Sequence, residues 1–231
     1  MESKPTAQQR KTKVITIDGP AGAGKSTVAK KLAKILRFFY LDTGAMYRAL
    51  TYKALNEKLH LENEDELVAL AKRTHIDLED TLEGGHVLLD GADVSEQIRS
   101  LEVTSSTMAV SSKPRVREIM VSWQRAIGQK RNVVIEGRDT GTVVFPDATF
   151  KFYIDADLAE RAKRRARDFE QQGTIIDQET LIHQINERDN KDKNREAGPL
   201  KKAADAVVID STNLSVDETV ARILQVINKN G

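Results

Sequence analysis

The stretch Gly19–Ser26, with the sequence GPAGAGKS, decides the fold of this chain. Two glycines bracket four residues and are followed by Lys and Ser, which is the spacing of a phosphate-binding loop. An apolar run at residues 14–17 precedes the loop, and apolar residues at helical spacing follow it over residues 28–36. The sequence therefore predicts the strand, loop and helix that this motif requires.

Each residue type in the loop has its own part in binding phosphate. Glycines allow positive φ and bring backbone N–H groups close to phosphate oxygens. The helix expected to begin near Lys25 adds the positive end of its dipole. Lys25 is predicted to reach the outer phosphates, and the Ser26 hydroxyl is predicted to ligate Mg²⁺. A glycine-rich turn without a ligand is the alternative, but it would not need Lys and Ser at fixed offsets. The predicted phosphate-binding residues are Gly19, Pro20, Ala21, Gly22, Ala23, Gly24, Lys25, Ser26 and Thr27.

Length and composition limit the classes of protein to be considered. With 231 residues, the chain is long enough for one α/β domain with a sizeable insertion. Lys and Arg (36) nearly balance Asp and Glu (35), so the net charge does not indicate nucleic acid or an anionic membrane as a partner. The chain has no cysteine, which excludes disulfides and is compatible with a reducing cytosol. We therefore expect a cytoplasmic monomer without a nucleic-acid or membrane partner.

The pattern along the chain predicts a short tail followed by one domain that carries an insertion. Residues 1–13 are polar and basic without a secretory signal, and predict a disordered tail; a phosphate-binding arm is the alternative. Residues 14–231 form the domain. Within it, residues 63–112 combine a polar helix with short apolar runs separated by glycine-containing turns, which predicts an inserted antiparallel meander. We interpret His75 and His86 there as structural or solvated rather than metal-binding.

Two clusters of polar side chains follow predicted strands. One follows the aromatic run at residues 38–41, and the other follows the apolar run at residues 132–135. The carboxyl ends of parallel strands form the ligand crevice of an open sheet, so both clusters are expected where a second substrate lies. A helix cap and a solvated turn are the respective alternatives. The candidate residues are Asp42, Thr43, Arg48, Glu136, Arg138 and Asp139.

A charged helical hairpin is predicted at residues 161–200, between apolar runs at 151–154 and 206–209 that predict further strands. Four residues of its second helix share one face, namely Arg188, Lys191, Asp192 and Arg195. Beside a phosphate loop such a face can close over polyphosphate, because phosphoryl transfer needs cations that neutralise charge and expel water. A solvated, salt-bridged helix is the alternative. We therefore expect a helical lid.

Five short motifs occur in an order that resembles the bacterial cytidylate kinase family, from residue 14 to the end of the chain. They are Ile17–Pro20, Leu41–Arg48, Pro114–Arg117, Gly137–Asp139 and Glu187–Asp189. The resemblance implies an α/β fold in which a P-loop NTPase-type parallel sheet is flanked by helices, with a small insertion at residues 63–112 that binds a nucleoside monophosphate (NMP) and a helical lid at residues 161–200. It also implies that the γ-phosphoryl group of ATP is transferred with Mg²⁺ to CMP or dCMP, giving ADP and CDP or dCDP.

The resemblance assigns roles residue by residue. The implied phosphate clamps are Arg48, Arg138 and Arg195. The implied ribose contacts are Arg188 and Asp192, and the implied cytosine contacts are Arg117 and Asp139. Arginine forks suit a dianionic phosphate, and an arginine with an aspartate presents donors and an acceptor to the cytosine edge. The residues implied to bind the NMP are Asp42, Thr43, Arg48, Arg117, Arg138, Asp139, Arg188, Asp192 and Arg195. The residues implied to be catalytic are Lys25, Arg138, Arg188 and Arg195, and the implied metal ligand is Ser26.

Some positions depart from the family pattern. Met108 stands where the family places a base-contacting Ser, with Thr107 and Ser111 nearby. Glu136 replaces the usual Asp, and lysines at positions 191 and 193 stand where arginines are often found, although Lys is a point charge and not a bidentate fork. We still expect CMP and dCMP to be preferred over UMP.

Two other functions stay open at this point. Another P-loop kinase, acting on a different nucleotide or on shikimate, would share the loop. A GTPase-like switch would need the guanine-reading pattern Asn-Lys-x-Asp, whereas Asn190–Lys193 has the Asp one place early.

Overall fold

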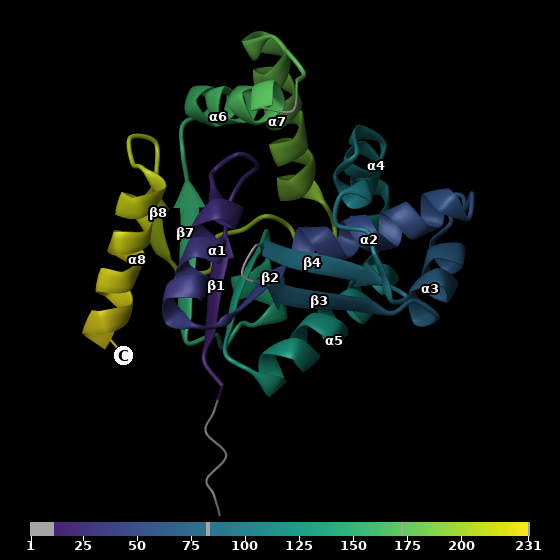
Figure 1. Ribbon diagram of the computed structural model, residues 1–231, viewed down its shortest axis with the longest axis horizontal. Coiled ribbons are helices and arrows are strands. Elements are labelled where there is room, and N and C mark those ends of the chain that lie inside the picture. Colours follow the sequence, from purple (N-terminus) through teal and green to yellow (C-terminus); the bar gives the residue numbers. More distant parts are fainter. Residues whose placement is uncertain (1–11, 82–83, 172, 231) are drawn as a thin grey trace, which may run out of the picture.

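The centre of the molecule is a five-stranded parallel sheet of order β2-β6-β1-β7-β8 (Figure 1). The computed structural model describes residues 12–81, 84–171 and 173–230. The strands are β1 (Val14–Asp18), β2 (Phe39–Asp42), β6 (Val133–Gly137), β7 (Phe150–Asp155) and β8 (Val207–Asp210). The motif strand β1 is central, and β2 and β7 lie on opposite sides of it. This confirms the predicted parallel sheet and places a crevice at the carboxyl end of β1.

Helices cover both faces of the sheet because the strands bury side chains in both directions. On β6, Val133 and Ile135 belong to one apolar cluster, and Val134 belongs to the other. The first cluster packs beneath α2 (Thr43–Asn56), α3 (Glu64–Lys72), α4 (Leu101–Ser111) and α5 (Pro114–Lys130). The second packs beneath α1 (Lys25–Leu36) and α8 (Val216–Asn230). The helices α1, α2 and α8, which follow β1, β2 and β8, are therefore packed directly on the sheet.

The insertion contains the predicted meander. Strands β3 (Ile76–Thr81), β4 (Gly84–Leu89) and β5 (Ala92–Asp93) form an antiparallel sheet, and the short helix η1 (Gln97–Arg99) follows it. Ile76, Val87 and Leu89 are buried in the same apolar cluster as α2 and α5. The meander therefore shares the core of the main domain, and its role as an NMP-binding subdomain stays a prediction.

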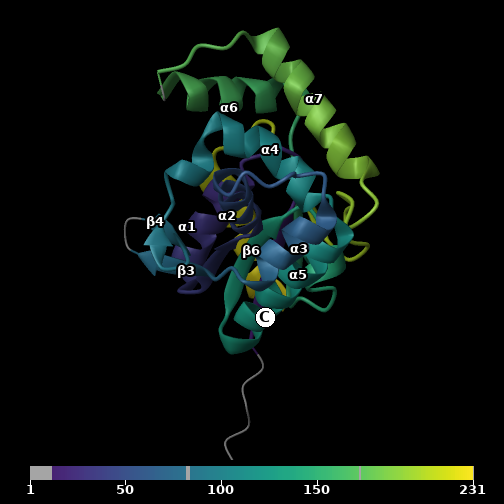
Figure 2. The same cartoon turned by 90° about the vertical axis from the view of Figure 1, so that its right-hand side faces the viewer.

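Two helices form the predicted hairpin at residues 161–200. They are α6 (Leu158–Gln171) and α7 (Gln178–Asn194), and both lie at one end of the molecule beyond the carboxyl end of β7 (Figures 1 and 2). Their apolar side chains form a third cluster that is separate from the two clusters around the sheet. In the rest of the article, the lid means α6, α7 and the residues between them that the structure describes.

The tail predicted at residues 1–13 lies outside the described residues as far as residue 11. Thr12 Oγ1 donates a hydrogen bond of 2.7 Å to the Gly128 carbonyl, and the Lys13 N–H donates one of 2.8 Å to Asn132 Oδ1. Thr12 and Lys13 therefore belong to the folded body. Within the described part of the chain, no helix has the length and apolar composition needed to cross a membrane.

Candidate active site

The phosphate loop connects β1 to α1 and is shaped by two of its glycines. A Cβ at Gly19 would collide with the carbonyl oxygen of Ile154 on β7, so the loop leaves the sheet where only glycine fits. Gly24 has a φ of 83° and caps α1 without a side-chain hydrogen bond. The first N–H groups of α1 consequently have no side-chain cap and are available to an anion, as predicted.

Lys25 is held inside the loop with its charge weakly compensated. Its side chain is buried, with an overall exposure of 5%, and Nζ donates a hydrogen bond of 2.6 Å to the Pro20 carbonyl. Burial and the nearby Arg138 guanidinium lower the pKa of Lys25 to about 7, against the opposing effect of Glu136. An anionic ligand would restore the charged form, so Lys25 is poised for phosphate.

The first predicted polar cluster lies at the start of α2. Asp42 is its N-cap: Oδ1 accepts a hydrogen bond of 2.9 Å from the Ala45 N–H, while Oδ2 pairs with Arg48 Nη2 at 3.0 Å. Burial raises the pKa of Asp42, but Arg48 and the Ala45 N–H outweigh it and hold this pKa below its usual value. Thr43 Oγ1 donates to the Glu136 carbonyl at 2.8 Å. Asp42 thus combines both roles considered from the sequence, since it caps a helix and orients an arginine.

The second predicted cluster begins with Glu136 at the end of β6. Tyr40 donates a hydrogen bond of 2.7 Å to Oε1 of this buried carboxylate. Burial and the neighbouring Asp42 raise the pKa of Glu136, while Lys25 and the hydroxyls of Ser26 and Tyr40 lower it. Glu136 therefore stands beside both Lys25 and Ser26, the two polar side chains of the phosphate loop.

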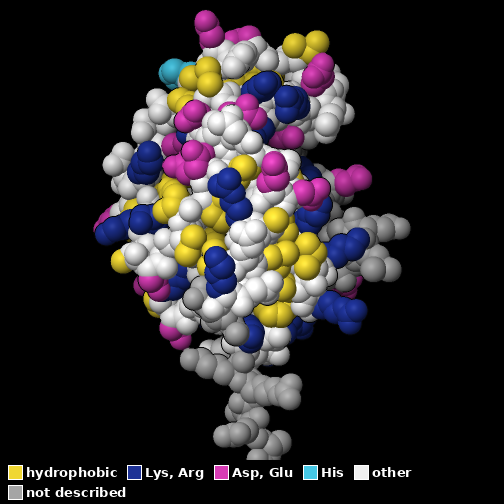
Figure 3. Space-filling model, turned by 90° about the vertical axis from the view of Figure 1, so that its left-hand side faces the viewer, with side chains coloured by type: hydrophobic (Ala, Val, Ile, Leu, Met, Phe, Trp, Pro, Cys, Tyr) yellow, Lys and Arg dark blue, Asp and Glu magenta, His cyan; other side chains and the backbone are white. Residues whose placement is uncertain are grey.

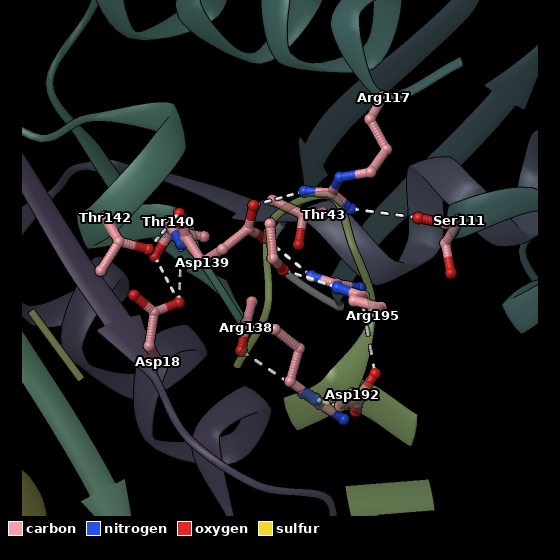
Figure 4. A network of polar contacts seen from close by, with 12 residues as sticks. Asp18, Thr43, Ser111, Arg117, Arg138, Asp139, Thr140, Thr142, Asp192 and Arg195 are labelled. Atoms are coloured by element: carbon pink, nitrogen blue, oxygen red, sulfur yellow. Dashed lines mark hydrogen bonds and ion pairs between the residues drawn. The ribbon is translucent and has the colours of Figure 1, made fainter. Parts of the chain in front are cut away.

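Asp18 holds the loop that follows β6, and the sequence prediction did not include it. Its Oδ1 accepts hydrogen bonds of 2.8 Å from both the N–H and the hydroxyl of Thr140, and its Oδ2 accepts one of 2.7 Å from the Gly141 N–H (Figure 4). Burial raises the pKa of Asp18. The local signals were its position at the end of β1, directly before the phosphate loop, and its place in the motif Ile17–Pro20. Through these bonds the strand that carries the loop also orients Arg138 and Asp139.

Arg117 and Asp139, the two residues implied to contact cytosine, form a buried ion pair. Their side chains are only 5% and 8% exposed, and Arg117 Nη1 also donates to the Ser111 carbonyl at 3.2 Å (Figure 4). Arg195 Nη2 contacts the other Asp139 oxygen at 3.2 Å, and Arg195 Nε donates to the Gly198 carbonyl at 2.6 Å. A Cβ at Gly198 would collide with this pair, so Gly198 is a site residue that the sequence prediction missed.

The second lid helix, α7, contributes Asp192 and its C-cap Arg195 to the same cluster of ion pairs. Arg138 Nε lies 2.7 Å from Asp192 Oδ2, and Arg195 Nη1 lies 3.9 Å from Asp192 Oδ1 (Figure 4). Burial and Arg138 lower the pKa of Arg188 to about 10. Lys191 does not join these pairs, because it is exposed and its Nζ contacts Glu187 at 2.6 Å.

One cleft of about 2940 Å³ is lined by all the residues predicted to bind the NMP. The phosphate loop lines it too, except for Gly19 and Pro20 at the base of the loop. Met108, Thr107 and Ser111 line it as well. The Thr107 hydroxyl donates to the Val103 carbonyl at 2.6 Å, so its hydrogen is already used within α4. We call the acceptor face the charged residues of the predicted NMP-binding set, all of which line this cleft: Asp42, Arg48, Arg117, Arg138, Asp139, Arg188, Asp192 and Arg195.

A parallel sheet with a phosphate loop at its centre, a second face of arginines and carboxylates, and a helical lid define a P-loop phosphotransferase. The model of the cytidylate kinase family matches residues 15–229, and the chain belongs to this family. It is 50% identical over 216 residues to the cytidylate kinase of Caldanaerobacter subterraneus subsp. tengcongensis, covering 94% of this chain and 95% of that one. It is also 50% identical over 215 residues to the cytidylate kinase of Geobacillus sp. (strain WCH70), covering 93% and 96% of the two chains.

A solved structure supports the fold alone. An uncharacterized protein from Eubacterium ventriosum superposes with a TM-score of 0.51 at 15% identity, covering 94% of this chain and 99% of that one. Family membership is carried by the sequence relatives, and it decides against the GTPase-like switch and the shikimate kinase that the loop alone left open.

Proposed function

We propose that the protein transfers the γ-phosphoryl group of ATP to CMP or dCMP, giving ADP and CDP or dCDP. The observation that carries the proposal is the single cleft in which the phosphate loop faces a set of buried arginine–carboxylate pairs. The loop would bind the phosphates of the donor nucleotide, and different residues of the acceptor face would bind the phosphate, the ribose and the base of the acceptor nucleotide. Membership of the cytidylate kinase family agrees with this assignment.

The chemistry needs positioning and charge stabilisation rather than a strong base. The acceptor is a phosphate oxygen that is already ionised; it forms a bond to the γ-phosphorus while the oxygen bridging to the β-phosphate leaves with ADP. Lys25 stabilises charge on the donor phosphates, and Arg138, Arg188 and Arg195 stabilise it on the transferred group. Arg48, which Asp42 orients, holds the acceptor phosphate, and Thr43 fixes the start of α2 beside it.

The ribose and base are assigned to the remaining pairs. Asp192 is kept ionised because Arg138 and its hydrogen bond outweigh the effect of burial, which raises its pKa. Its carboxylate and the Arg188 guanidinium can then bind sugar hydroxyls. Arg117 donates and Asp139 accepts, which matches the two kinds of group on the cytosine edge. The preference for CMP and dCMP over UMP rests on this last pair.

The side-chain oxygen atoms beside Lys25 are suitable ligands for Mg²⁺. Magnesium prefers oxygen ligands and is usually bound by one or two protein groups together with substrate phosphates and water. The Ser26 hydroxyl is such a group, and the buried Glu136 carboxylate stands next to it. When bound there, the ion would neutralise charge on the donor phosphates.

We also propose that the protein works as a cytoplasmic monomer without a nucleic-acid or membrane partner. The near balance of 36 basic and 35 acidic residues supports this. On the face shown in Figure 3, basic and acidic side chains are interspersed.

An acceptor panel tests the proposed function. ADP release from ATP and Mg²⁺ is measured in a coupled assay with CMP, dCMP, UMP, AMP, GMP and shikimate offered separately. We expect CMP and dCMP to give the highest kcat/KM. Release that does not depend on any acceptor would contradict the kinase proposal, and a better acceptor outside this pair would replace the substrate.

A further inference from the structure

The lid is attached to the phosphate loop by polar contacts rather than by a shared core. Its apolar cluster consists mainly of Ala162, Phe169, Leu181 and Ile185, and none of these residues belongs to the two clusters around the sheet. Where the lid meets the loop, Asp189 of α7 and Arg161 of α6 form hydrogen bonds with the backbone of Ala21. The position of the lid therefore depends on a small number of polar side chains.

One ion pair within the lid holds Ala21 of the loop by both of its backbone polar groups. Asp189 Oδ1 accepts a hydrogen bond of 3.1 Å from the Ala21 N–H, and Arg161 Nη1 donates one of 2.9 Å to the Ala21 carbonyl. The same Arg161 nitrogen pairs with Asp189 Oδ2, and Arg161 Nε donates to the Ala156 carbonyl at 3.0 Å. The two side chains are only 9% and 5% exposed. Both charged side chains and both backbone polar groups of Ala21 therefore have partners, as a buried pair requires.

The backbone of α6 also fits closely against the next residue of the loop. A Cβ at Gly22 would lie 3.1 Å from both the Cβ and the carbonyl oxygen of Arg161, and Gly22 has a φ of +76° that L side chains rarely adopt. The loop cannot shift toward α6 without displacing Arg161. The shape of the loop and the position of the lid are thus set by the same contacts.

We propose that the Arg161–Asp189 pair is a latch that positions the phosphate loop for ATP and couples the loop to the lid. The Ala21 N–H then binds the lid and does not donate a hydrogen bond to phosphate. Phosphate binding is left to the N–H groups from Gly22 to Thr27. Both latch residues are positioning residues. The proposal rests on the proposed function only in taking ATP as the donor nucleotide.

If the pair is a latch, its removal should change the affinity for ATP in a defined direction. Without Asp189, the Arg161 guanidinium is a buried charge without its carboxylate, and the Ala21 N–H loses its acceptor, so the loop relaxes from the shape that binds phosphate. ATP binding should become weaker. If Asp189 acted only as a negative charge near the phosphates, its removal would instead make ATP binding tighter.

Calorimetric binding to Asp189→Ala and Asp189→Asn tests the latch. The dissociation constant (Kd) is measured for a non-hydrolysable ATP analogue without any acceptor, and separately for CMP. Asp168→Asn is the matched control, because Asp168 is also paired with a lid arginine, Arg165, but is 59% exposed. We expect Asp189→Ala to raise the Kd of the ATP analogue about tenfold or more, which corresponds to one charged hydrogen bond. Asp189→Asn should lose less, because it keeps an oxygen that accepts from Ala21.

Three results would overturn the latch: tighter binding of the ATP analogue by Asp189→Ala, an unchanged Kd, or an equal rise in the Kd of CMP and of the analogue. Hydrogen exchange of the ligand-free protein gives a second readout, in which Ala21 should exchange faster in Asp189→Ala, which removes the acceptor of its N–H, but not in Asp168→Asn. Unchanged exchange at Ala21 would also contradict the latch. The measurements of ATP-analogue binding and of hydrogen exchange involve no turnover. If the acceptor panel showed that another acceptor is phosphorylated, the proposed function would be refuted, but this test of the latch would still be valid.

Discussion

The two sides of the cleft are built in different ways. The donor side consists of consecutive residues, and the binding groups that we propose for it are backbone N–H groups, the Lys25 ammonium and the Ser26 hydroxyl. The acceptor face collects side chains from the end of β2, from α2, α5 and the loop after β6, and from α7 and its C-cap. Most of its charges are paired with one another across the fold. Arg138 and Asp192, for example, are 54 positions apart. The donor side is therefore specified locally, whereas the acceptor face exists only once the chain has folded.

This difference predicts that substitutions on the two sides of the cleft affect activity in different ways. Backbone donors and Lys25 treat the donor phosphates alike whichever acceptor is bound, so a change there should affect every acceptor equally. Four arginines of the acceptor face are held by carboxylates in a defined geometry, namely Arg48, Arg117, Arg138 and Arg195, and breaking a buried pair leaves the other charge uncompensated. A change on that face should therefore discriminate between acceptors or between steps.

The largest effect is expected on the donor side. Lys25→Ala should lower kcat/KM by about 10²–10³-fold for every acceptor, because it removes a preorganised charge at the donor phosphates. The coupled ADP-release assay measures this loss. Lys34→Ala is the control, since Lys34 is an exposed residue of the same helix, and it should change kcat/KM by less than about threefold. A loss that differed between CMP and UMP would show that Lys25 is not confined to the donor side.

On the acceptor face, Arg138→Lys should lower kcat/KM for CMP by about 10- to 100-fold. The lysine keeps the positive charge but loses the planar fork that contacts Asp192 and a phosphate together. Arg73→Lys, at an exposed pair with Glu57, serves as the matched control. If Arg138→Lys retained wild-type kinetics, charge alone would suffice at this position.

A smaller effect should follow from pH. Burial lowers the pKa of Lys25 to about 7 in the folded chain, compared with about 10.4 when unfolded. Between these values the unfolded state binds more protons, so the contribution of Lys25 to the free energy of unfolding rises with pH. ATP needs the charged form, so binding should take up a proton, and the ATP affinity should fall about fivefold between pH 7 and 8.

Calorimetry of ATP binding at pH 8 in buffers of different ionisation enthalpy measures this proton uptake. Lys25→Arg is the control, because arginine stays charged throughout this range and should abolish the uptake. The same uptake in Lys25→Arg would assign the proton to another group.

The smallest effect concerns the departure at Met108. Met108→Ser adds a hydroxyl to the wall of the cleft next to Thr107. We expect the ratio of kcat/KM for CMP to that for UMP to rise by about twofold to fivefold, which is the size of one neutral hydrogen bond. Kinetics with both acceptors measure the ratio, and a fall in the ratio would place the base elsewhere.

The sequence predicted what has a local pattern, and it missed what depends on distant partners. The loop, the parallel strands, the meander and the helical hairpin each have a motif or a periodicity, and the structure confirms them. Asp18 was missed because its partner Thr140 is 122 positions away, and Asp189 was missed because Ala21 is 168 positions away. Gly198 was missed because the need for a glycine arises only when Asp139 and Arg117 meet beside it.

Lys191 shows the limit of helical spacing. It shares a face and the cleft with Arg188 and Arg195, but its side chain is exposed and its Nζ pairs with Glu187. Spacing defines a face of a helix, and only tertiary packing decides which side chains on that face are buried.

The claim that the acceptor face sets the identity of the substrate is tested most directly with Arg117→Ala. kcat/KM is measured for CMP, dCMP and UMP with the wild type and the variant. The account predicts a loss of about 10- to 100-fold for CMP and dCMP, a much smaller loss for UMP, and a CMP to UMP ratio close to one in the variant. An equal loss for all three acceptors would contradict it, because Arg117 would then support the fold or the phosphate and not the base.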